Sequence, residues 1–600
     1  MAHLSSGLLA PCFQYMRIVR SPANQGNGLW CLDFLSRSGN IYSDAAKYSF
    51  VSERERVPMT TLLKWLSFIL LLCVACGAEA QMINAASCNA SDVQAAFNSV
   101  TSSTTTVVIP AGTCSWSTGV TLNVPSGSTT LSVVGQSSPT GYNAQGSPTG
   151  FTDSTLIVDN YNSDNAILAI TTAGNSSYFR LTGISIQGGS GGGSNNPKYG
   201  ILYVGGNSHN TRIDHIHINN STYSPGESGA LIAFHGWVYG VTDHSQFDLG
   251  GGVGTPNGVW TWQDGYNGDT AGYGDNAWAD STQLGSANFM FMENNAFNNY
   301  GSVNDCTHGG KFVLRYSTIS GGSGEAPGMQ THPTGGSGRA RGCRAWEIYE
   351  NNLSGSNSSP QYNAYFLSSG TGVLWGNSAP AGFEQFVSAH NVRSDNSDYS
   401  QTATPNGWGY CGTNSSGTGS GWDQNTSTTS GYACIDQVGR GKGDQLEGQF
   451  PNACDQTQGC PSYNGSWPNQ ALEPVYEWLD SWTAAPGYGY SFWNTTEGGS
   501  VIVQNRDYYL WCNASSPTGC TSAFNGTQGT GSGLLSARPS TCTPQVAYWA
   551  TDTSTLYQCS STNTWTAYYT PYTYPHPLTQ SSGSSGTPPV PPTNLQAVVN

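Results

Sequence analysis

One pattern recurs in FRLTGISI (179–186), RIDHIHI (212–218), YGVTDHSQF (239–247), FMFMENNAF (289–297), FVLRYSTI (312–319) and AWEIYENNL (345–353). Each segment has an alternating apolar run, a small polar residue and a final apolar residue. The final residues are 32, 29, 50, 22 and 34 positions apart, a shortest period of 22 with variable additions. Stacked coils whose extra residues become loops produce such spacing. We therefore expect an all-β chain that folds as a parallel β-helix, a solenoid.

Two columns of residues support this register. The residues five positions before each final residue are mostly apolar and should face the core: Leu181, Ile213, Thr242, Met292, Leu314 and Ile348. The residues two positions before it turn polar along the chain: Ile184, Ile216, Ser245, Asn295, Ser317, Asn351 and, one coil later, Asn377. Asn and Ser stacked at a turn can hydrogen-bond along a solenoid, as side-chain ladders do in stacked strands.

A third column, four positions before each final residue, has the opposite parity and should point outward: Thr182, Asp214, Asp243, Glu293, Arg315 and Tyr349. Stacked strands lie about 4.8 Å apart, so adjacent carboxylates repel each other unless a cation joins them. Asp214, Asp243 and Glu293, hereafter the acidic column, therefore predict a Ca²⁺ site, because calcium prefers oxygen ligands. A solvated acidic ladder next to an arginine is the alternative.

Basic residues concentrate near the next coils. Of the 20 Lys and Arg residues, seven precede residue 81 and five fall within 311–344. Such a density of ionisable groups is typical of an active site, although a stabilising ion-pair network would give it too. The candidate catalytic residues are Lys311, Arg315, Arg341, Arg344, Asp305, His308, His332 and Glu347.

The 50-residue step contains an insertion, about 250–286, with four candidate substrate-binding aromatics: Trp260, Trp262, Tyr273 and Trp278. Exposed aromatic rings can stack on sugar rings; ordinary loop packing is the alternative. A second insertion, 320–342, should lie two coils away. Two loops that flank one strand face form a cleft suited to a polymer.

The composition excludes several classes of protein. Only 9% of residues are charged, with a net charge of −16, while Gly reaches 76 and Trp, Tyr and Phe reach 18, 32 and 19. These values exclude coiled coils and argue against nucleic acid, whose phosphates need a basic face. They favour an extracellular β protein that handles a polysaccharide, and we expect a monomer.

A secretory signal is expected at 59–80, MTTLLKWLSFILLLCVACGAEA, with a short basic start, an apolar run and small residues at the cleavage site. The run is too short to span a membrane. Twelve cysteines follow it and fall into sequence neighbours, 88/114, 306/343, 411/434, 454/460, 512/520 and 542/559. This even number favours disulfides in a secreted protein over a metal site.

The sequence divides into six regions. We expect an upstream extension (1–58), the signal peptide (59–80), the β-helix (81–405) with a cap helix at 91–100, and the last coils with a Cys-rich cover (406–540). A small aromatic module (541–580) follows, then a linker that leads into the start of a fibronectin type III domain (581–600). The cap helix should have Ser91 as its N-cap and cover the exposed end of the solenoid.

The chain resembles the pectate-lyase-like superfamily of right-handed parallel β-helix lyases and glycosidases over residues 81–380. Arg212-Ile213-Asp214-His215 is similar to the Trp-Ile-Asp-His motif of pectate lyases, whose Asp binds calcium, but lacks the Trp. Arg339 and Arg344 keep the outer spacing of the Arg-x-Pro-x-x-Arg pattern that supplies the lyase base, with Arg341 in place of Pro. The resemblance implies secreted polysaccharide degradation.

Three functions remain open. A lyase would abstract the proton next to a uronate carboxyl with an Arg or Lys of 311–344, assisted by calcium on the acidic column. A glycoside hydrolase would use a carboxyl pair from Asp305, Glu347, Asp243 and Glu293. A glycan-binding surface protein would bind without turnover. Lyase activity is the leading hypothesis.

Overall fold

The computed structural model describes residues 16–20, 30–34 and 81–580, the last range with gaps. The gaps are 162, 164, 175–176, 189–199, 220–229, 249–256, 270–271, 273, 301, 322–328, 332–340, 356–360, 390–435, 444–469, 488–492, 495–501 and 514–522. The unit Met1–Gln81 contains an antiparallel pair, β1 (Met16–Arg20) and β2 (Trp30–Phe34). The expected signal peptide and the expected fibronectin start lie outside the described residues.

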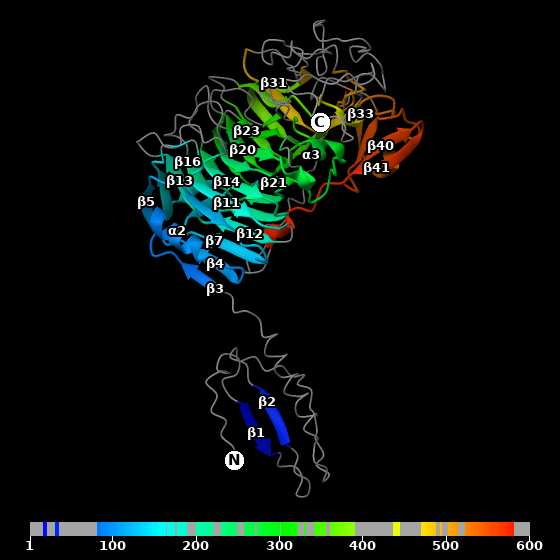
Figure 1. Cartoon of the computed structure of the whole chain (residues 1–600). Coiled ribbons are helices and arrows are strands. Elements are labelled where there is room, and N and C mark those ends of the chain that lie inside the picture. The colour runs from blue at the N-terminus through cyan, green and yellow to red at the C-terminus, as the bar shows by residue number, and fades with distance from the viewer. Residues whose placement is uncertain are drawn as a thin grey trace, which may run out of the picture. The chain divides into compact units, whose positions relative to one another are not determined.

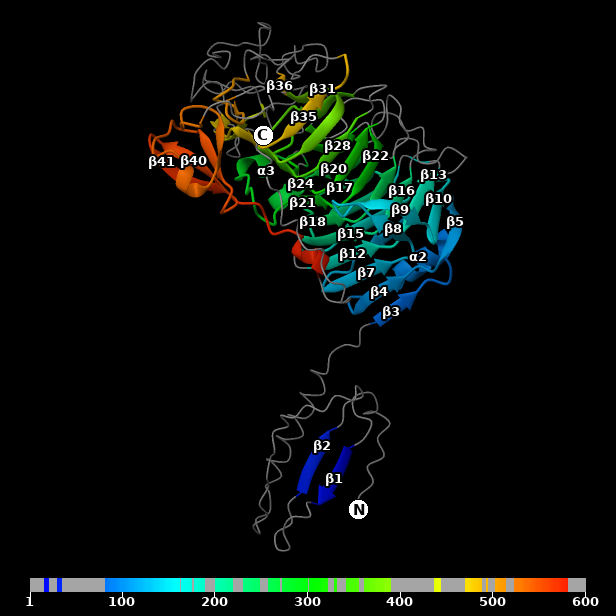
Figure 2. The same ribbon diagram turned by 180° about the vertical axis from the view of Figure 1, so that it is seen from behind.

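The unit Met82–Asn600 is a parallel β-helix with three walls (Figures 1 and 2). The first wall is a 12-stranded sheet. Its strands are β3 (Gln81–Asn84), β4 (Thr104–Val108), β7 (Thr130–Val134), β12 (Tyr178–Thr182), β15 (Asn210–Asp214), β18 (Gly240–Asp243), β21 (Met290–Glu293), β24 (Lys311–Arg315), β27 (Ala345–Tyr349), β30 (Thr371–Trp375), β34 (Val475–Trp478) and β37 (Tyr508–Tyr509). The neighbours from β4 to β37 pair in parallel, as the 22-residue period predicts.

A 19-stranded sheet forms the other two walls. The second wall contains β5 (Gly112–Trp116), β10 (Thr155–Asp159), β13 (Ser185–Gly188), β16 (His217–Asn219), β19 (Gln246–Asp248), β22 (Ala296–Tyr300), β25 (Thr318–Gly321), β28 (Asn352–Ser354), β31 (Ser378–Ala389) and β35 (Ser481–Ala484). The third contains β6 (Val120–Asn123), β11 (Leu168–Thr172), β14 (Leu202–Gly206), β17 (Ala230–Phe234), β20 (Asn257–Trp262), β23 (Ser302–Thr307), β26 (Met329–Thr331), β29 (Gln361–Leu367) and β36 (Trp493–Asn494), and β31 extends into it.

The predicted register is confirmed residue by residue. The final apolar residues pair in one column, from Ile186 with Ile218 to Ile319 with Leu353, and all are buried. The column from Leu181 to Ile348 is also continuous and buried. Both columns line the interior, where removal of their apolar surface from water stabilises the coils.

The turn between the first two walls explains the polar column. Within it, the backbone N–H groups of Ser245, Ser317 and Asn351 donate to the side-chain oxygens of Asn295, Asn351 and Asn377. The ladder continues one coil further, because the Asn377 N–H donates to Asp480 Oδ1 at 2.7 Å. The side chains thus satisfy buried backbone donors that a tight turn would leave unpaired.

A helix covers the first coil of the solenoid, and a small sheet covers part of its side. The helix α2 (Ala90–Asn98) buries Val93, Ala96 and Phe97, as expected, but it begins one residue earlier than predicted and its N-cap is Asn89. At the other end of the sequence, β38 (Thr530–Gly533), β39 (Ala547–Ala550), β40 (Thr555–Ser561) and β41 (Thr564–Tyr569) form a small sheet. Figure 2 shows β40 and β41 of this sheet. The sheet packs aromatic residues against the outer face of the first wall, where Trp549 lies 5.2 Å from Trp375 and 5.1 Å from Trp478.

Three predicted disulfides are formed: Cys88–Cys114, Cys306–Cys343 and Cys542–Cys559. Cys512 is also disulfide-bonded. The other predicted pairs involve cysteines outside the described residues. No helix in the described part of the chain is long and apolar enough to cross a membrane.

Candidate functional site: an aromatic and histidine platform on the third wall

The acidic column exists in the predicted register, but arginines supply its positive charge. Asp214 pairs with Asp243, and Asp243 with Glu293, on successive strands of the first wall. Arg180 binds Asp214 at 2.6 Å, Arg212 binds Asp243 at 2.8 Å, and Arg315 binds Glu293 at 2.6 Å. Each carboxylate of the acidic column therefore has an arginine partner. The described residues include no group of three or more His, Cys, Asp and Glu side chains suited to a metal.

The acidic column is also covered rather than exposed. Residues 571–580, hereafter the C-terminal segment, lie across it, and its three carboxylates are fully buried. The Arg315 guanidinium donates to the Tyr572 and Thr573 carbonyls at 2.8 and 3.0 Å, and the His576 N–H donates to Glu293 at 2.9 Å. The column faces outward, as predicted, but the C-terminal segment covers it.

The other candidate arginines are held in the same way. Arg341 binds Asp436 at 2.5 Å, and Arg344 binds Glu473 at 2.7 Å. The indole of Trp278 lies 5.2 Å from the Arg341 guanidinium and 5.3 Å from that of Arg344, and it is fully buried. This part of the predicted cluster is an ion-pair and cation–π network, and Trp278 presents no face to a sugar.

Lys311 and Glu347 are buried outward-facing residues of β24 and β27. Burial, reinforced by the charge of Arg344, lowers the pKa of Lys311 to about 7, and its ammonium donates to the Ser281 carbonyl. Burial raises the pKa of Glu347 to about 7, although Gly285 and Tyr569 donate hydrogen bonds to it. Both groups are packed beneath other chain segments.

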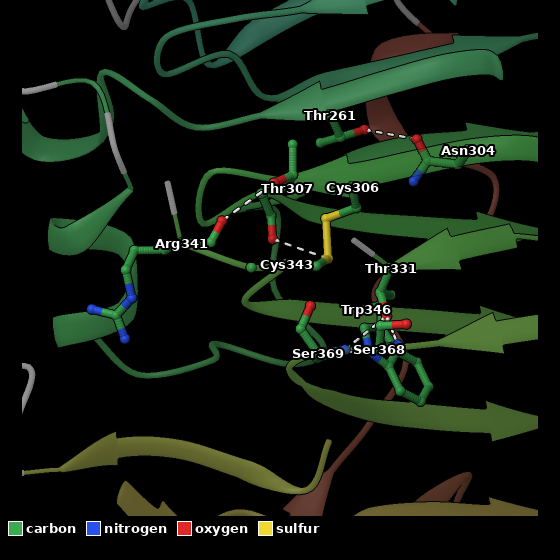
Figure 3. The surroundings of a disulfide bond; sticks show 12 residues. Thr261, Asn304, Cys306, Thr307, Thr331, Arg341, Cys343, Trp346, Ser368 and Ser369 are labelled. Carbon is green, nitrogen blue, oxygen red and sulfur yellow. Dashed lines mark hydrogen bonds between the residues drawn. A yellow bond between two sulfur atoms is a disulfide. The ribbon is translucent and has the colours of Figure 1, made fainter. Parts of the chain in front are cut away.

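The disulfide Cys306–Cys343 fixes the end of β23 to the strand entry of β27 (Figure 3). The carbonyl of Arg341 accepts a hydrogen bond from Thr307 Oγ1 at 3.3 Å, and the His308 N–H donates to the same carbonyl at 2.7 Å. Thr261 on β20 bonds Asn304 on β23 across the neighbouring coil at 3.2 Å (Figure 3). His308 is therefore held on a rigid backbone at the end of the third wall.

Half-buried and buried rings gather at this end of the third wall. The Trp262 ring lies between His235, whose centroid is 4.4 Å away, and His308, which stacks on it at 4.1 Å and 15°. Trp260 stacks on Trp262 from the same strand at 5.1 Å, and Tyr203 lies 5.4 Å from His235 on the preceding coil. We call these five residues the platform. Its rings follow the solenoid axis because their strands are in register.

Two carboxylates adjoin the platform. Asp264 accepts a hydrogen bond from the Gly236 N–H at 2.5 Å and bonds His235 Nδ1 at 3.2 Å. Burial alone would raise the pKa of Asp264, but these bonds outweigh it and hold the pKa below its usual value. Asp305 lies beside Trp260 in register and is 8% exposed. The platform therefore combines ring faces with an oriented imidazole.

A second row of rings lies at the corner toward the first wall. Trp237 lies 4.7 Å from His209 and 5.0 Å from Tyr266, a residue of η1 (Tyr266–Gly268). Lys311 lies 4.9 Å above the Tyr266 ring. The insertion 264–286, which includes α3 (Asp275–Ala279), thus connects the platform to the buried lysine.

The sequence found part of this site. It named Asp305, His308, Trp260 and Trp262, which the fold brings together from β20 and from β23 with the residue after it. It missed His235 as a site residue, because His235 follows a strand outside the repeated segments. Tyr273 and His332 lie outside the described residues, as does Arg339.

The two carboxylates come from different parts of the coil. Asp305 pairs with Trp260 within β20, whereas Asp264 lies in the turn that follows this strand. Glycosidase pairs are about 5–9.5 Å apart. We assign no such pair to Asp264 and Asp305; the platform offers aromatic rings beside an imidazole that Asp264 holds.

No family model matches the chain, and no curated protein matches it either. Among solved structures, Geobacillus virus E2 ORF18 matches with a TM-score of 0.27 and 11% identity. The match covers 61% of this chain, and the chain spans 64% of that protein.

Proposed function

We propose that this protein is secreted and cleaves an extracellular acidic polysaccharide by β-elimination, with the glycan bound on the platform. One observation carries the proposal: the Asp264-bonded imidazole of His235 adjoins the half-buried ring of Trp262. Aromatic side chains with a few fixed polar groups commonly line ligand-binding sites. The composition, the disulfides and the resemblance to the pectate-lyase-like superfamily support a secreted glycan-active protein.

His235 is the base in this proposal. Asp264 bonds its Nδ1, so we assign the proton to Nε2, and the glycan must displace the neighbouring groups that bury this atom in the structure. Nε2 takes the proton next to the uronate carboxyl; the C–H electrons form the new C=C bond, and the glycosidic C–O bond breaks. The leaving oxygen takes a proton from water, the proton on Nε2 is then released to solvent, and the reaction is redox-neutral. Arg315, Arg341 and Arg344 are less suited, because each is already in an ion pair.

Binding without turnover is the second candidate function. β-Elimination needs a positive charge near the uronate carboxylate to acidify the neighbouring proton. Arg315, Arg341 and Arg344 are already in ion pairs, and this favours binding without turnover. Hydrolysis is less favoured, because Asp243 and Glu293 are adjacent but fully buried.

The experiment exposes the full chain to polygalacturonate, alginate and xylan, with calcium or with a chelator. It records the ultraviolet absorbance of unsaturated uronides, reducing ends and polymer binding. We expect an absorbance rise that persists in chelator and is lost in His235→Asn. His244→Gln is the matched control, because that histidine also bonds an Asp but lies at another corner.

Each outcome separates the candidates. Reducing ends without absorbance would establish hydrolysis, and binding without either product would establish the second candidate. If turnover strictly required calcium, the result would support the predicted Ca²⁺ site at the acidic column. The absence of both binding and turnover would contradict the proposal.

A further inference from the structure

A repeated Asp-His pair lies away from the platform, at the turn between the first and second walls. Asp214 Oδ2 bonds His215 Nδ1 at 2.6 Å, and Asp243 Oδ2 bonds His244 Nδ1 at 2.7 Å on the next coil. Both histidines have left-handed backbones, with φ of 50° and 48°. The shared backbone geometry and the shared carboxylate contact give the two side chains the same orientation.

The two imidazoles form a parallel pair. Their centroids are 5.6 Å apart and their planes differ by 7°. Their side chains are 31% and 25% exposed, so solvent reaches both rings. Because each Nδ1 is bonded to a carboxylate, each Nε2 is the nitrogen available to a ligand.

The carboxylates behind the rings are firmly fixed. Arg212 lies 3.4 Å from Asp214 and 2.8 Å from Asp243, and both carboxylates are fully buried. A metal-binding histidine commonly donates its second nitrogen to such a carboxylate, which fixes the tautomer and makes the free nitrogen more basic. This pattern occurs twice, on adjacent coils, and the platform does not use it.

We propose that the Nε2 atoms of His215 and His244 bind one divalent transition-metal ion, with water as the remaining ligands. Imidazole nitrogens suit Cu²⁺, Ni²⁺ and Zn²⁺ rather than Ca²⁺. Metal–nitrogen bonds of about 2.0–2.1 Å require the two rings, whose planes differ by 7° here, to rotate out of this parallel arrangement toward each other when the ion binds. The site is separate from the calcium prediction, whose carboxylates here serve as partners of the histidines.

The test uses Cu²⁺ as the probe, on the full chain without a polyhistidine tag. Titration calorimetry measures the affinity, and electron paramagnetic resonance counts the coordinated nitrogens. We expect one Cu²⁺ with two imidazole nitrogens. His215→Gln and His244→Gln should each lower the affinity at least about 10-fold. Glutamine keeps an N–H donor for the Asp, and thermal melting checks that the variants fold.

His209→Gln is the matched control, because this half-buried histidine lies against Trp237 and Tyr239 instead of another histidine. It should bind Cu²⁺ as the unchanged protein does. Equal affinity in the His215→Gln/His244→Gln double variant would show binding at unrelated side chains and overturn the proposal. A spectrum with a single nitrogen would overturn it too. Binding should also weaken in acid, since the metal competes with protons for Nε2.

Discussion

At the scale of single residues, charge pairing under the C-terminal segment decides what the acidic column does. Arg315 is fully buried, contacts Glu293, and donates to backbone carbonyls about 257 positions later in the chain. A buried charge that loses its partner is costly, whereas removal of both charges together can cost little. If Arg315 and Glu293 form a structural ion pair, loss of one charge should therefore cost more stability than loss of both.

Arg315→Ala should therefore lower the free energy of unfolding by about 3–5 kcal/mol, because Glu293 remains buried without its partner. The double variant Arg315→Met/Glu293→Gln should recover a large part of this loss. Chemical denaturation of the three proteins measures the difference. Equal losses in the single and double variants would contradict the pairing argument.

His217 should make stability depend on pH. Burial alone would lower its pKa, but bonds to Asp153 at 2.8 Å and Asp248 at 2.9 Å raise the pKa to about 9. The folded pKa lies above the unfolded value of 6.5, so the contribution is complete below pH 6.5 and is lost as pH rises through about 9. It amounts to at most about 3 kcal/mol.

Denaturation at a series of pH values measures this effect. His217→Asn should flatten the decline between about pH 6.5 and about pH 9. His209→Asn provides the comparison, since burial lowers the pKa of His209 and it should leave this decline in place. An unchanged decline in His217→Asn would assign the pH dependence to other groups.

At the scale of elements, the polar turn ladder is the feature that sequence predicted best. The period placed Asn295, Ser317, Asn351 and Asn377 in one column, and the hydrogen bonds follow that column. A solenoid repeats one local environment, so spacing alone determines which side chains become neighbours. The predicted apolar and acidic columns were correct for the same reason.

Asn351→Ala should cost about 3 kcal/mol, because it leaves the buried Ser317 N–H and the Leu314 carbonyl without these bonds. Asn352→Ala is the matched control on the adjacent position of β28 and should change stability by less than about 0.5 kcal/mol. Urea denaturation of both variants tests this. Similar small losses at the two positions would show that the ladder contributes little.

Contacts between segments that are distant in the chain could not be predicted from the repeat spacing. The C-terminal segment, which buries the acidic column, and Asp436, which binds Arg341, come from regions where the period is lost. The His235–Asp264 bond joins a residue after β17 to one after β20, and both lie outside the repeated segments. Sequence spacing identifies neighbours along the stack, but not which chain segment covers each outer face.

At the scale of the whole molecule, buried carboxyl groups should favour mildly acidic conditions. Burial raises the pKa values of Glu347 and Glu350 to about 7 each. The folded pKa values exceed the unfolded value of 4.5, so their contribution is complete below pH 4.5 and is lost as pH rises through about 7. The lowered pKa of Lys311 makes stability rise with pH, but only above about pH 7.

The melting temperature should therefore fall between about pH 5 and about pH 7, and Glu347→Gln should reduce the fall. Differential scanning calorimetry across this range measures it. Asp92→Asn, on the surface of the cap helix, is the control. A melting temperature that rises through this range would contradict the assigned carboxyl contributions.

The central claim is that the functional face is the platform on the third wall, and not the acidic column on the first. The most direct measurement compares polysaccharide binding by Trp262→Ala and Asp243→Asn at a temperature where both are folded. We predict that Trp262→Ala weakens binding about 10-fold or more, whereas Asp243→Asn lowers stability and leaves binding intact. Binding that survives Trp262→Ala but is lost in folded Asp243→Asn would contradict the account.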